Sequence, residues 1–252
     1  MRPDARGEGR CDSAPVATAA PPLPQRPPAG AALRAASVAF LPGLLLGLAL
    51  AASVVGLAAY LLVLRPRLAR FGATGEETRA RLPGDGFVRP RVESTRATSI
   101  RAPVPVVWSW LVQLGQGRGG FYSYDVLENL AGLRIHSADR IDPALQHLAP
   151  GDLVRTAPES FGPEAGFRVL EAEACRALVL DVAAGAGTWA FVLREEGEGR
   201  TRLLVRWRLG GSRLGAAAYV LAVEIPHFLM ERGMLQGIAR RAERVAAARP
   251  RS

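Results

Sequence analysis

The hydrophobic pattern of the chain is dominated by one long uncharged run near its start. No charged residue lies between Arg34 and Arg65, and the stretch LPGLLLGLALAASVVGLAAYLLVL within this run is almost wholly apolar. A transmembrane helix needs about 20 consecutive apolar residues. We therefore predict a membrane-spanning helix in residues 35–64. Proline is tolerated at the first turn of a helix, so Pro42 predicts a well-formed span over residues 43–64.

A cleaved signal peptide is the alternative interpretation of this run. Ala49, Leu50 and Ala51 have the small-x-small pattern of a cleavage site. The apolar part of a secretory signal is about 7–15 residues long, whereas this run continues to Leu64. A soluble buried helix of this length would show a polar face. The pattern therefore favours a retained anchor.

The arginines that flank the run predict its orientation. Two arginines lie close before the run, Arg26 and Arg34, whereas the segment after it carries Arg65, Arg67, Arg70, Arg79 and Arg81. Positive residues stay on the cytoplasmic side of a span. We expect a single-pass protein of a bacterial cell membrane, with its C-terminal part in the cytoplasm.

The remainder of the chain alternates between strand and helix patterns. Runs rich in Val, Thr, Ile and aromatic residues predict strands; they are residues 92–101, 152–156, 167–173, 177–182, 188–194 and 202–209. In the last strand Leu203, Val205 and Trp207 alternate with arginines, which is typical of a half-buried antiparallel strand.

Three helices are expected among these strands. Residues 106–114 form a short apolar helix after Pro103 and Pro105, and residues 143–148 have only short helical potential. Residues 121–132 form a second helix with Ser123 as its N-cap and Gly132 after its end. Its buried stripe is expected to be Leu127, Leu130 and Ala131. The third helix starts at Pro226 and runs to about residue 248, and its apolar face is expected to be Phe228, Met234 or Leu235, Ile238, Ala242 and Val245.

This order predicts an α+β fold. A long terminal helix cannot bury its apolar face alone and must lie on the sheet. A curved sheet around one helix leaves a cavity between the two. The expected organisation is a Pro-, Ala- and Arg-rich disordered tail over residues 1–34, the transmembrane helix over residues 35–64, a charged connector over residues 65–91 and the folded domain over residues 92–248.

Composition excludes several classes of site. The net charge is +9 and every basic residue is arginine, because the chain contains no lysine. A Schiff-base lysine and a phosphate-loop lysine are therefore excluded. The two cysteines, Cys11 and Cys175, form no disulfide framework, and the histidines show no metal-ligand spacing. We expect neither a metal nor a cofactor, and no nucleic-acid motif accompanies the arginines.

Two segments carry candidate chemistry. Phe121, Tyr122 and Tyr124 cluster beside Asp125 at the start of a predicted helix; they are either walls of a ligand pocket or ordinary core packing. His136 and Asp139 are candidates for an acid–base pair, and a capped, salt-bridged loop is the alternative. The loop 115–120 is rich in glycine but follows a helix and lacks lysine, so a tight turn explains it better than a phosphate site.

The segments as a whole resemble a known superfamily. The stretch APVPVVWSWLVQLGQGRGGFYSYDVLENLAG is followed by IHSADRI, GDLVR, TWAFVL, TRLLVRWR and a terminal HFLMERGMLQGIARRAE. Together they resemble the SRPBCC superfamily, which is START-like and polyketide-cyclase-like, over residues 94–248. The resemblance is to bacterial members of unassigned function, many of which carry membrane segments.

The resemblance implies a helix-grip fold, in which a curved antiparallel sheet surrounds the long C-terminal helix, with a hydrophobic pocket between them. We expect a membrane-anchored domain that binds a hydrophobic small molecule or lipid. The alternative is a cyclase or dehydratase that acts on a polyketide-like substrate through His136 and an acid. The candidate ligand-binding residues are Trp110, Phe121, Tyr122, Tyr124, Asp125, His136, Trp189, Phe191, Trp207 and Phe228.

Overall fold

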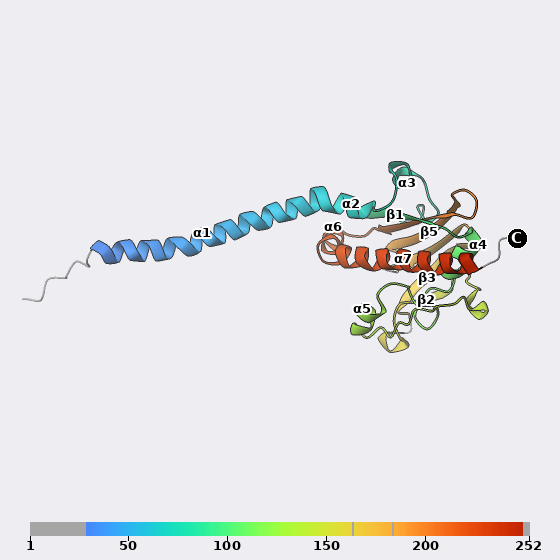
Figure 1. Cartoon of the computed structure of the whole chain (residues 1–252). Coiled ribbons are helices and arrows are strands. Elements are labelled where there is room, and N and C mark those ends of the chain that lie inside the picture. The colour runs from blue at the N-terminus through green and yellow to red at the C-terminus, as the bar shows by residue number, and fades with distance from the viewer. Residues whose placement is uncertain (1–28, 163, 183, 249–252) are drawn as a thin grey trace, which may run out of the picture. The chain divides into compact units, whose positions relative to one another are not determined.

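A computed structural model describes residues 29–162, 164–182 and 184–248 (Figure 1). The chain divides into two compact units, one up to Gly56 and one from Leu57 onward. The first unit is formed by helix α1, Ala29–Ala59, which runs a few residues past the division. The expected tail over residues 1–34 lies for the most part outside the described residues, as does Cys11.

Pro42 lies inside α1 and not at its first turn, so that expectation was wrong. The residues between Ala29 and Pro42 are rich in alanine and leucine, which have the highest helix propensities. A proline in a helix removes one backbone hydrogen bond, and the strong helix formers before it keep the helix continuous.

The second unit opens with short helical elements. A π-helical turn, η1 (Tyr60–Leu64), is followed by α2 (Arg65–Ala69) and α3 (Gly75–Arg79). Thr74 caps α3, because its hydroxyl accepts from the Glu77 backbone N–H while the Glu77 carboxylate accepts from the Thr74 backbone N–H. The connector therefore has a defined structure.

Six antiparallel strands form one sheet, in the order β1-β6-β5-β4-β3-β2. The strands are β1 (Val92–Ile100), β2 (Leu153–Arg155), β3 (Gly166–Glu173), β4 (Ala177–Val182), β5 (Gly187–Glu195) and β6 (Thr201–Leu209). β1 and β6, the first and last strands, are neighbours, with Val92 opposite Leu209. Each strand predicted from the sequence is present within one or two residues of its expected ends.

The remaining helices are short except for the last one. They are α4 (Val104–Leu111), α5 (Asp125–Leu130), the 3-10 turns η2 (Pro143–Leu145) and η3 (Glu159–Phe161), α6 (Arg213–Ala218), the π-helical turn η4 (Tyr219–Val223) and α7 (Glu224–Ala248). α6, η4 and α7 follow one another without a break. The terminal helical segment therefore begins at Arg213, thirteen residues before the Pro226 start that the sequence suggested.

α7 lies along one face of the sheet (Figure 1). The side chains of the main core fill the space between them. Its apolar stripe is the predicted one, because Phe228, Met234, Leu235, Ile238 and Ala242 are buried. Gly237 lets the helix approach the Tyr122 backbone, since an added Cβ would lie 1.9 Å from the Tyr122 carbonyl oxygen. This is the predicted α+β, helix-grip arrangement of an antiparallel sheet around a long C-terminal helix.

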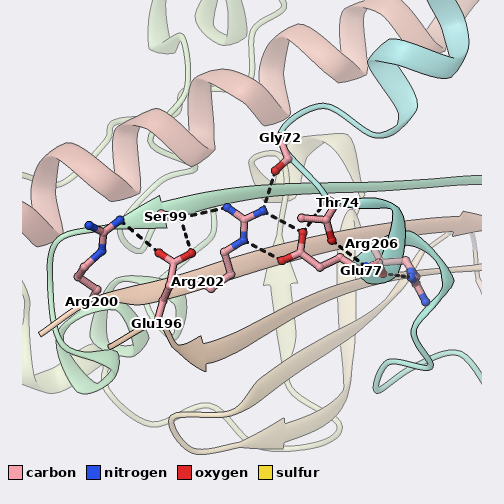
Figure 2. Close-up of polar contacts among 8 residues, drawn as sticks. All are labelled: Gly72, Thr74, Glu77, Ser99, Glu196, Arg200, Arg202 and Arg206. Carbon is pink, nitrogen blue, oxygen red and sulfur yellow. Dashed lines mark hydrogen bonds and ion pairs between the residues drawn. The ribbon is translucent and has the colours of Figure 1, made fainter. Parts of the chain in front are cut away.

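The connector covers the opposite face of the sheet. Leu82 packs against Ala97, Val192 and Leu204 in a second apolar cluster. The Arg202 guanidinium makes two contacts of 2.8 Å with the Glu77 carboxylate and also donates to the Gly72 carbonyl, as Figure 2 shows.

β6 is consequently buried on both faces, and the expectation of a half-buried strand was wrong. Arg206 is only 2% exposed. Its guanidinium pairs with Asp85 at 2.7 Å and donates to the carbonyl oxygens of Glu77, Thr78 and Ala80. The alternating arginines of β6 face the connector, so a charge pattern that is typical of solvent exposure serves here to hold a segment of the same chain.

Candidate functional site

A cavity of about 210 Å³ lies between the sheet, α7 and the segment around α5. Its walls are mostly apolar and aromatic, with a few polar groups. They are Phe121, Ser123, Glu128, Leu133, Ile135, Thr156, Phe167, Trp189, Trp207, His227, Met230, Glu231 and Met234. Apolar walls with few polar groups are what a small-molecule site requires.

Trp189 is the centre of the aromatic wall. Register places it directly opposite Trp207 on the neighbouring strand, and the two rings meet edge to face at 5.9 Å. Phe121 stacks on Trp189 at 6.5 Å and Phe167 meets its edge at 5.6 Å. Side chains alternate between the two faces of a strand, so residues at every second position of β5 and β6 point to the cavity side.

A chain of polar contacts runs from η4 and α7 to β1 beside this wall. The Tyr219 hydroxyl contacts His227 Nδ1 at 2.5 Å, and His227 Nε2 lies 3.4 Å from Glu231 Oε2. The same Glu231 oxygen accepts from Trp189 Nε1 at 3.1 Å. Glu231 Oε1 pairs with the Arg96 guanidinium at 2.8 Å. The indole of the central aromatic residue is thereby fixed in orientation.

Glu231 is charged although it is fully buried. Burial alone would raise the pKa of its carboxyl, but the Arg96 guanidinium and the His227 contact outweigh burial and leave the pKa below its ordinary value. A paired buried carboxylate of this kind is neutralised by its partner. It supports the cavity wall rather than presenting a free charge to a ligand.

Glu128 is the second acid of the cavity, and its environment shifts the pKa of its carboxyl in the opposite direction to that of Glu231. Burial raises the pKa of its carboxyl; the Ser123 hydrogen bond counters this in part, and the nearby Asp125 adds to it. Glu128 Oε1 accepts from the Ser123 hydroxyl. Its Oε2 is buried and has no hydrogen-bond partner among the described residues. A buried carboxyl in this position favours its neutral form.

This arrangement suits binding of apolar groups better than acid–base chemistry. Both ring nitrogens of His227 contact protein groups, so the imidazole is not free to take a proton from a ligand. Burial raises the pKa of the Glu128 carboxyl and so works against a charge in the cavity. The aromatic wall offers a large apolar surface, and aromatic side chains contribute strongly to the burial of ligands.

Three of the candidate residues predicted from the sequence line the cavity, namely Phe121, Trp189 and Trp207. Four others are buried in the packing around it. The Trp110 and Tyr122 rings meet edge to face at 5.6 Å, with the Tyr122 hydroxyl donating to the Trp110 carbonyl. Phe191 packs against Trp189, and Phe228 packs against Phe71.

The remaining candidates lie outside the cavity. His136 is exposed, and the Asp139 side chain is 78% exposed and faces Arg241 and Arg244. Asp125 accepts from the backbone N–H and the hydroxyl of Ser137, which holds a loop. Asp139 therefore belongs to a salt-bridged loop, the alternative that the sequence left open, and the exposed His136 lies in the same loop.

Tyr124 and α5 also differ from the expectation. The Tyr124 ring is partly exposed and lies over Gly233 of α7. Tyr124, not Ser123, is the residue before α5, and it makes no side-chain cap. Leu127 and Leu130 are exposed and Glu128 is buried instead, because α5 packs with its Glu128 side against the cavity. The buried stripe predicted for this helix was wrong.

His227, Glu231 and Glu128 are the functional candidates that sequence reasoning missed. His227 and Glu231 are four residues apart, a spacing that places them on one face of a helix. This four-residue spacing is visible in the sequence, whereas no pattern in the residues around Glu128 indicates that it is buried. Among the described residues no group of three metal-ligating side chains occurs, and Cys175 is a half-buried free thiol.

Comparisons with known proteins relate the chain to solved structures only. A scan against family models finds none that matches, and a search of curated proteins finds no match. The polyketide-cyclase-like protein Cgl2372 of Corynebacterium glutamicum is 15% identical, over 64% of this chain and 97% of its own, with a TM-score of 0.37.

Two further solved structures show a similar degree of likeness. The self-sacrificing resistance protein CalC of Micromonospora echinospora is 9% identical, over 62% of this chain and 97% of its own, with a TM-score of 0.38. The Aha1 dimer of Colwellia psychrerythraea is 12% identical, over 60% of this chain and 96% of its own, with a TM-score of 0.37. The helix-grip fold itself rests on the sheet and α7 described above.

Proposed function

We propose that this chain is a membrane-anchored domain that binds a hydrophobic small molecule or lipid in the cavity between the sheet and α7. The observation that carries this proposal is the aromatic wall of Phe121, Phe167, Trp189 and Trp207 around a cavity of about 210 Å³. Burying apolar surface supplies roughly 25 cal/mol per Å², so such a wall favours an apolar occupant.

The volume restricts the size of the occupant. Pockets for drug-sized ligands measure roughly 300–1,000 Å³, and this cavity is somewhat smaller at about 210 Å³. We therefore expect a compact ring system, or one end of a longer apolar chain, as the buried part of the ligand.

The membrane anchor is the second part of the proposal. The helical stretch Pro42–Ala69 is long and apolar enough to cross a membrane, and its most apolar part is not buried against the rest of the chain. The arginines after the run favour a cytoplasmic domain. A bilayer concentrates poorly soluble compounds, so an anchor keeps the cavity close to their source.

The cyclase or dehydratase alternative lacks a supporting constellation. Its proposed groups, His136 and Asp139, lie at the surface away from the cavity. The imidazole that does line the cavity, His227, has both ring nitrogens in contact with Tyr219 and Glu231. Binding is therefore the function that the geometry supports best.

Photo-crosslinking of the full chain in membranes tests the proposal. The probe is a palmitic acid that carries a diazirine, and the labelled peptides are identified by mass spectrometry. We expect labels on cavity residues such as Leu133, Met230 and Met234 as well as on the anchor. Labels confined to the anchor would contradict the proposal.

A further inference from the structure

The start of the terminal helical segment exposes an unusual apolar surface. In α6, η4 and the first turns of α7 the exposed large side chains are Leu214, Leu221, Val223, Ile225 and Leu229. Leu214 is 81% exposed and Leu221 is 62% exposed. Contiguous exposed apolar patches are rare on soluble monomers and mark interaction sites.

This surface also lacks exposed charge. The structure describes all of residues 214–230, and the one acid among them, Glu224, is only 1% exposed. Arg213 lies directly before the segment, and after it the buried Glu231 is followed by Arg232. A helix that faces water shows polar and charged residues on its outer side. We refer to residues 214–230 as the uncharged helical face.

The uncharged helical face adjoins the last turns of the predicted span. The Tyr60 hydroxyl lies 2.8 Å from the Val220 carbonyl oxygen and 3.1 Å from the Glu224 carboxylate, within hydrogen-bond reach of both. Arg65 pairs with the same carboxylate at 2.8 Å, so the acid is neutralised where the two helices meet. Leu62 and Val63 of that last turn are exposed as well. Two apolar surfaces therefore lie side by side within one compact unit.

The length of the exposed apolar segment and the arginines near it favour a lipid bilayer as the partner of the uncharged helical face. Leu214 to Val223 is a run of ten uncharged residues, about 15 Å of helix, which is too short to span a membrane. It is long enough to lie at the boundary of headgroups and acyl chains, as amphipathic helices do. Exposed arginines lie next in sequence to both apolar segments, Arg67 and Arg70 after the last turn of the predicted span and Arg213 before Leu214. Their charge matches the phosphates of anionic lipids.

We propose that the uncharged helical face is buried in one leaflet of an anionic bilayer beside the last turns of the span. The inference rests on the membrane anchor of the proposed function and goes beyond it. The helix Arg213–Ala248 is long and apolar enough to cross a membrane. Its C-terminal half packs in the core, however, where Ile238 and Ala242 are fully buried. It therefore enters the membrane only with its first turns.

The proposal gives the cavity a membrane-facing wall. His227 and Met230 belong to the uncharged helical face and also line the cavity. A ligand dissolved in the leaflet is then separated from the cavity by one helix and not by an aqueous layer.

Depth-dependent fluorescence quenching tests this position directly. Cys11 and Cys175 are replaced by serine in the full chain, and single variants Leu50→Cys, Leu221→Cys, Ile225→Cys and Gln236→Cys are labelled with the fluorophore NBD. The proteins are reconstituted in phosphatidylcholine–phosphatidylglycerol vesicles with or without doxyl-labelled lipid. Gln236 is the matched control, because it is exposed on the same helix beyond Arg232.

We expect doxyl lipid to quench NBD at Leu221 and Ile225 about threefold more than at Gln236, as for an interfacial helix. If NBD is quenched at Leu50 but fluoresces at Leu221 as it does in water, this inference is wrong and the membrane anchor is still supported. A lack of quenching at Leu50 would refute the anchor and with it this inference. If NBD at Leu221 is shielded from water but is not quenched by doxyl lipid, this inference is wrong, and a second copy of the chain covers the uncharged helical face instead.

Discussion

The Arg96 guanidinium lies 2.8 Å from the Glu231 carboxylate, and both side chains are buried from solvent. The pair joins β1 to α7 behind the aromatic wall of the cavity. Arg96 also donates to the Leu68 carbonyl at 2.9 Å. One buried ion pair therefore connects the segment that follows the predicted span with the helix that lines the cavity.

Breaking this pair should be costly. We expect Glu231→Gln to lower the free energy of unfolding by about 3–5 kcal/mol, because it leaves the Arg96 charge buried without a partner. Denaturation of the full chain in mild detergent, followed by tryptophan fluorescence, measures the loss. Glu173→Gln is the control, because its pair with Arg176 is largely exposed and such pairs contribute about 0–1 kcal/mol. Equal stability of the two variants would contradict the role given to Arg96 and Glu231.

The connector should make stability sensitive to acid. The hydrogen bond from Arg202 lowers the pKa of the Glu77 carboxyl from 4.5 to about 2. A lowered pKa means that the carboxylate stabilises the folded state above pH 4.5 and that this contribution is lost as the pH falls toward 2. We expect Glu77→Gln to cost roughly 1–3 kcal/mol at pH 7 and to flatten the stability profile below pH 4.5.

Unfolding free energies measured at a series of pH values test this expectation. Glu76→Gln is the matched control, because Glu76 is the exposed neighbour in the same short helix, where substitutions stay within about 0.5 kcal/mol. If the unfolding free energies of both variants follow the wild-type dependence on pH, the contact between Glu77 and Arg202 contributes nothing measurable to stability.

Glu128 should show the opposite dependence on pH. Because burial raises the pKa of its carboxyl, the folded state resists ionisation, and stability is lost as the pH rises through the raised pKa. We expect Glu128→Gln to melt at a higher temperature than wild type at pH 8, with a smaller difference at pH 4. Melting curves at the two pH values measure this. An equal decrease of the melting temperature at both pH values would show that burial does not raise the pKa of Glu128 in the folded protein.

Close packing of α7 on the Tyr122 backbone should make Gly237 intolerant of change. An added Cβ would lie 1.9 Å from the Tyr122 carbonyl oxygen. We expect Gly237→Ala to destabilise the protein by about 2 kcal/mol or more, since the helix must shift away from its contact. Gln236→Ala, at the exposed neighbouring position, should leave the melting temperature unchanged or slightly raised. Similar melting temperatures would show that the helix does not approach this closely.

The regular elements were predictable because their apolar periodicity matches their packing. Alternation in β6 identified Leu203, Val205 and Trp207 as the core-facing residues, and the stripe of α7 identified Ile238 and Ala242. The arginines on the opposite face of β6 were misread as solvent-exposed, because a segment distant in sequence covers them. Periodicity shows which residues share a face and does not show what packs against the face.

The site was only partly predictable for a related reason. Phe121, Trp189 and Trp207 were identified because large aromatic residues are conspicuous. Trp110 and Tyr122 are equally conspicuous, yet they pack in the core without lining the cavity. Glu128 is buried because α5 packs with its Glu128 side against the cavity, which no local sequence pattern specifies. Which aromatic residues border a cavity depends on how helix and sheet are placed, and this is a property of the tertiary structure.

Native mass spectrometry of the full chain, extracted from membranes in mild detergent, tests the central claim of a ligand-binding cavity most directly. Leu133 lines the cavity, so Leu133→Trp should fill it, whereas Leu130→Trp adds the same bulk at a site that is 80% exposed. We expect a bound apolar molecule on the wild-type chain and on Leu130→Trp, and its loss from Leu133→Trp. An unoccupied wild-type chain, or equal occupancy of the two variants, would contradict the claim.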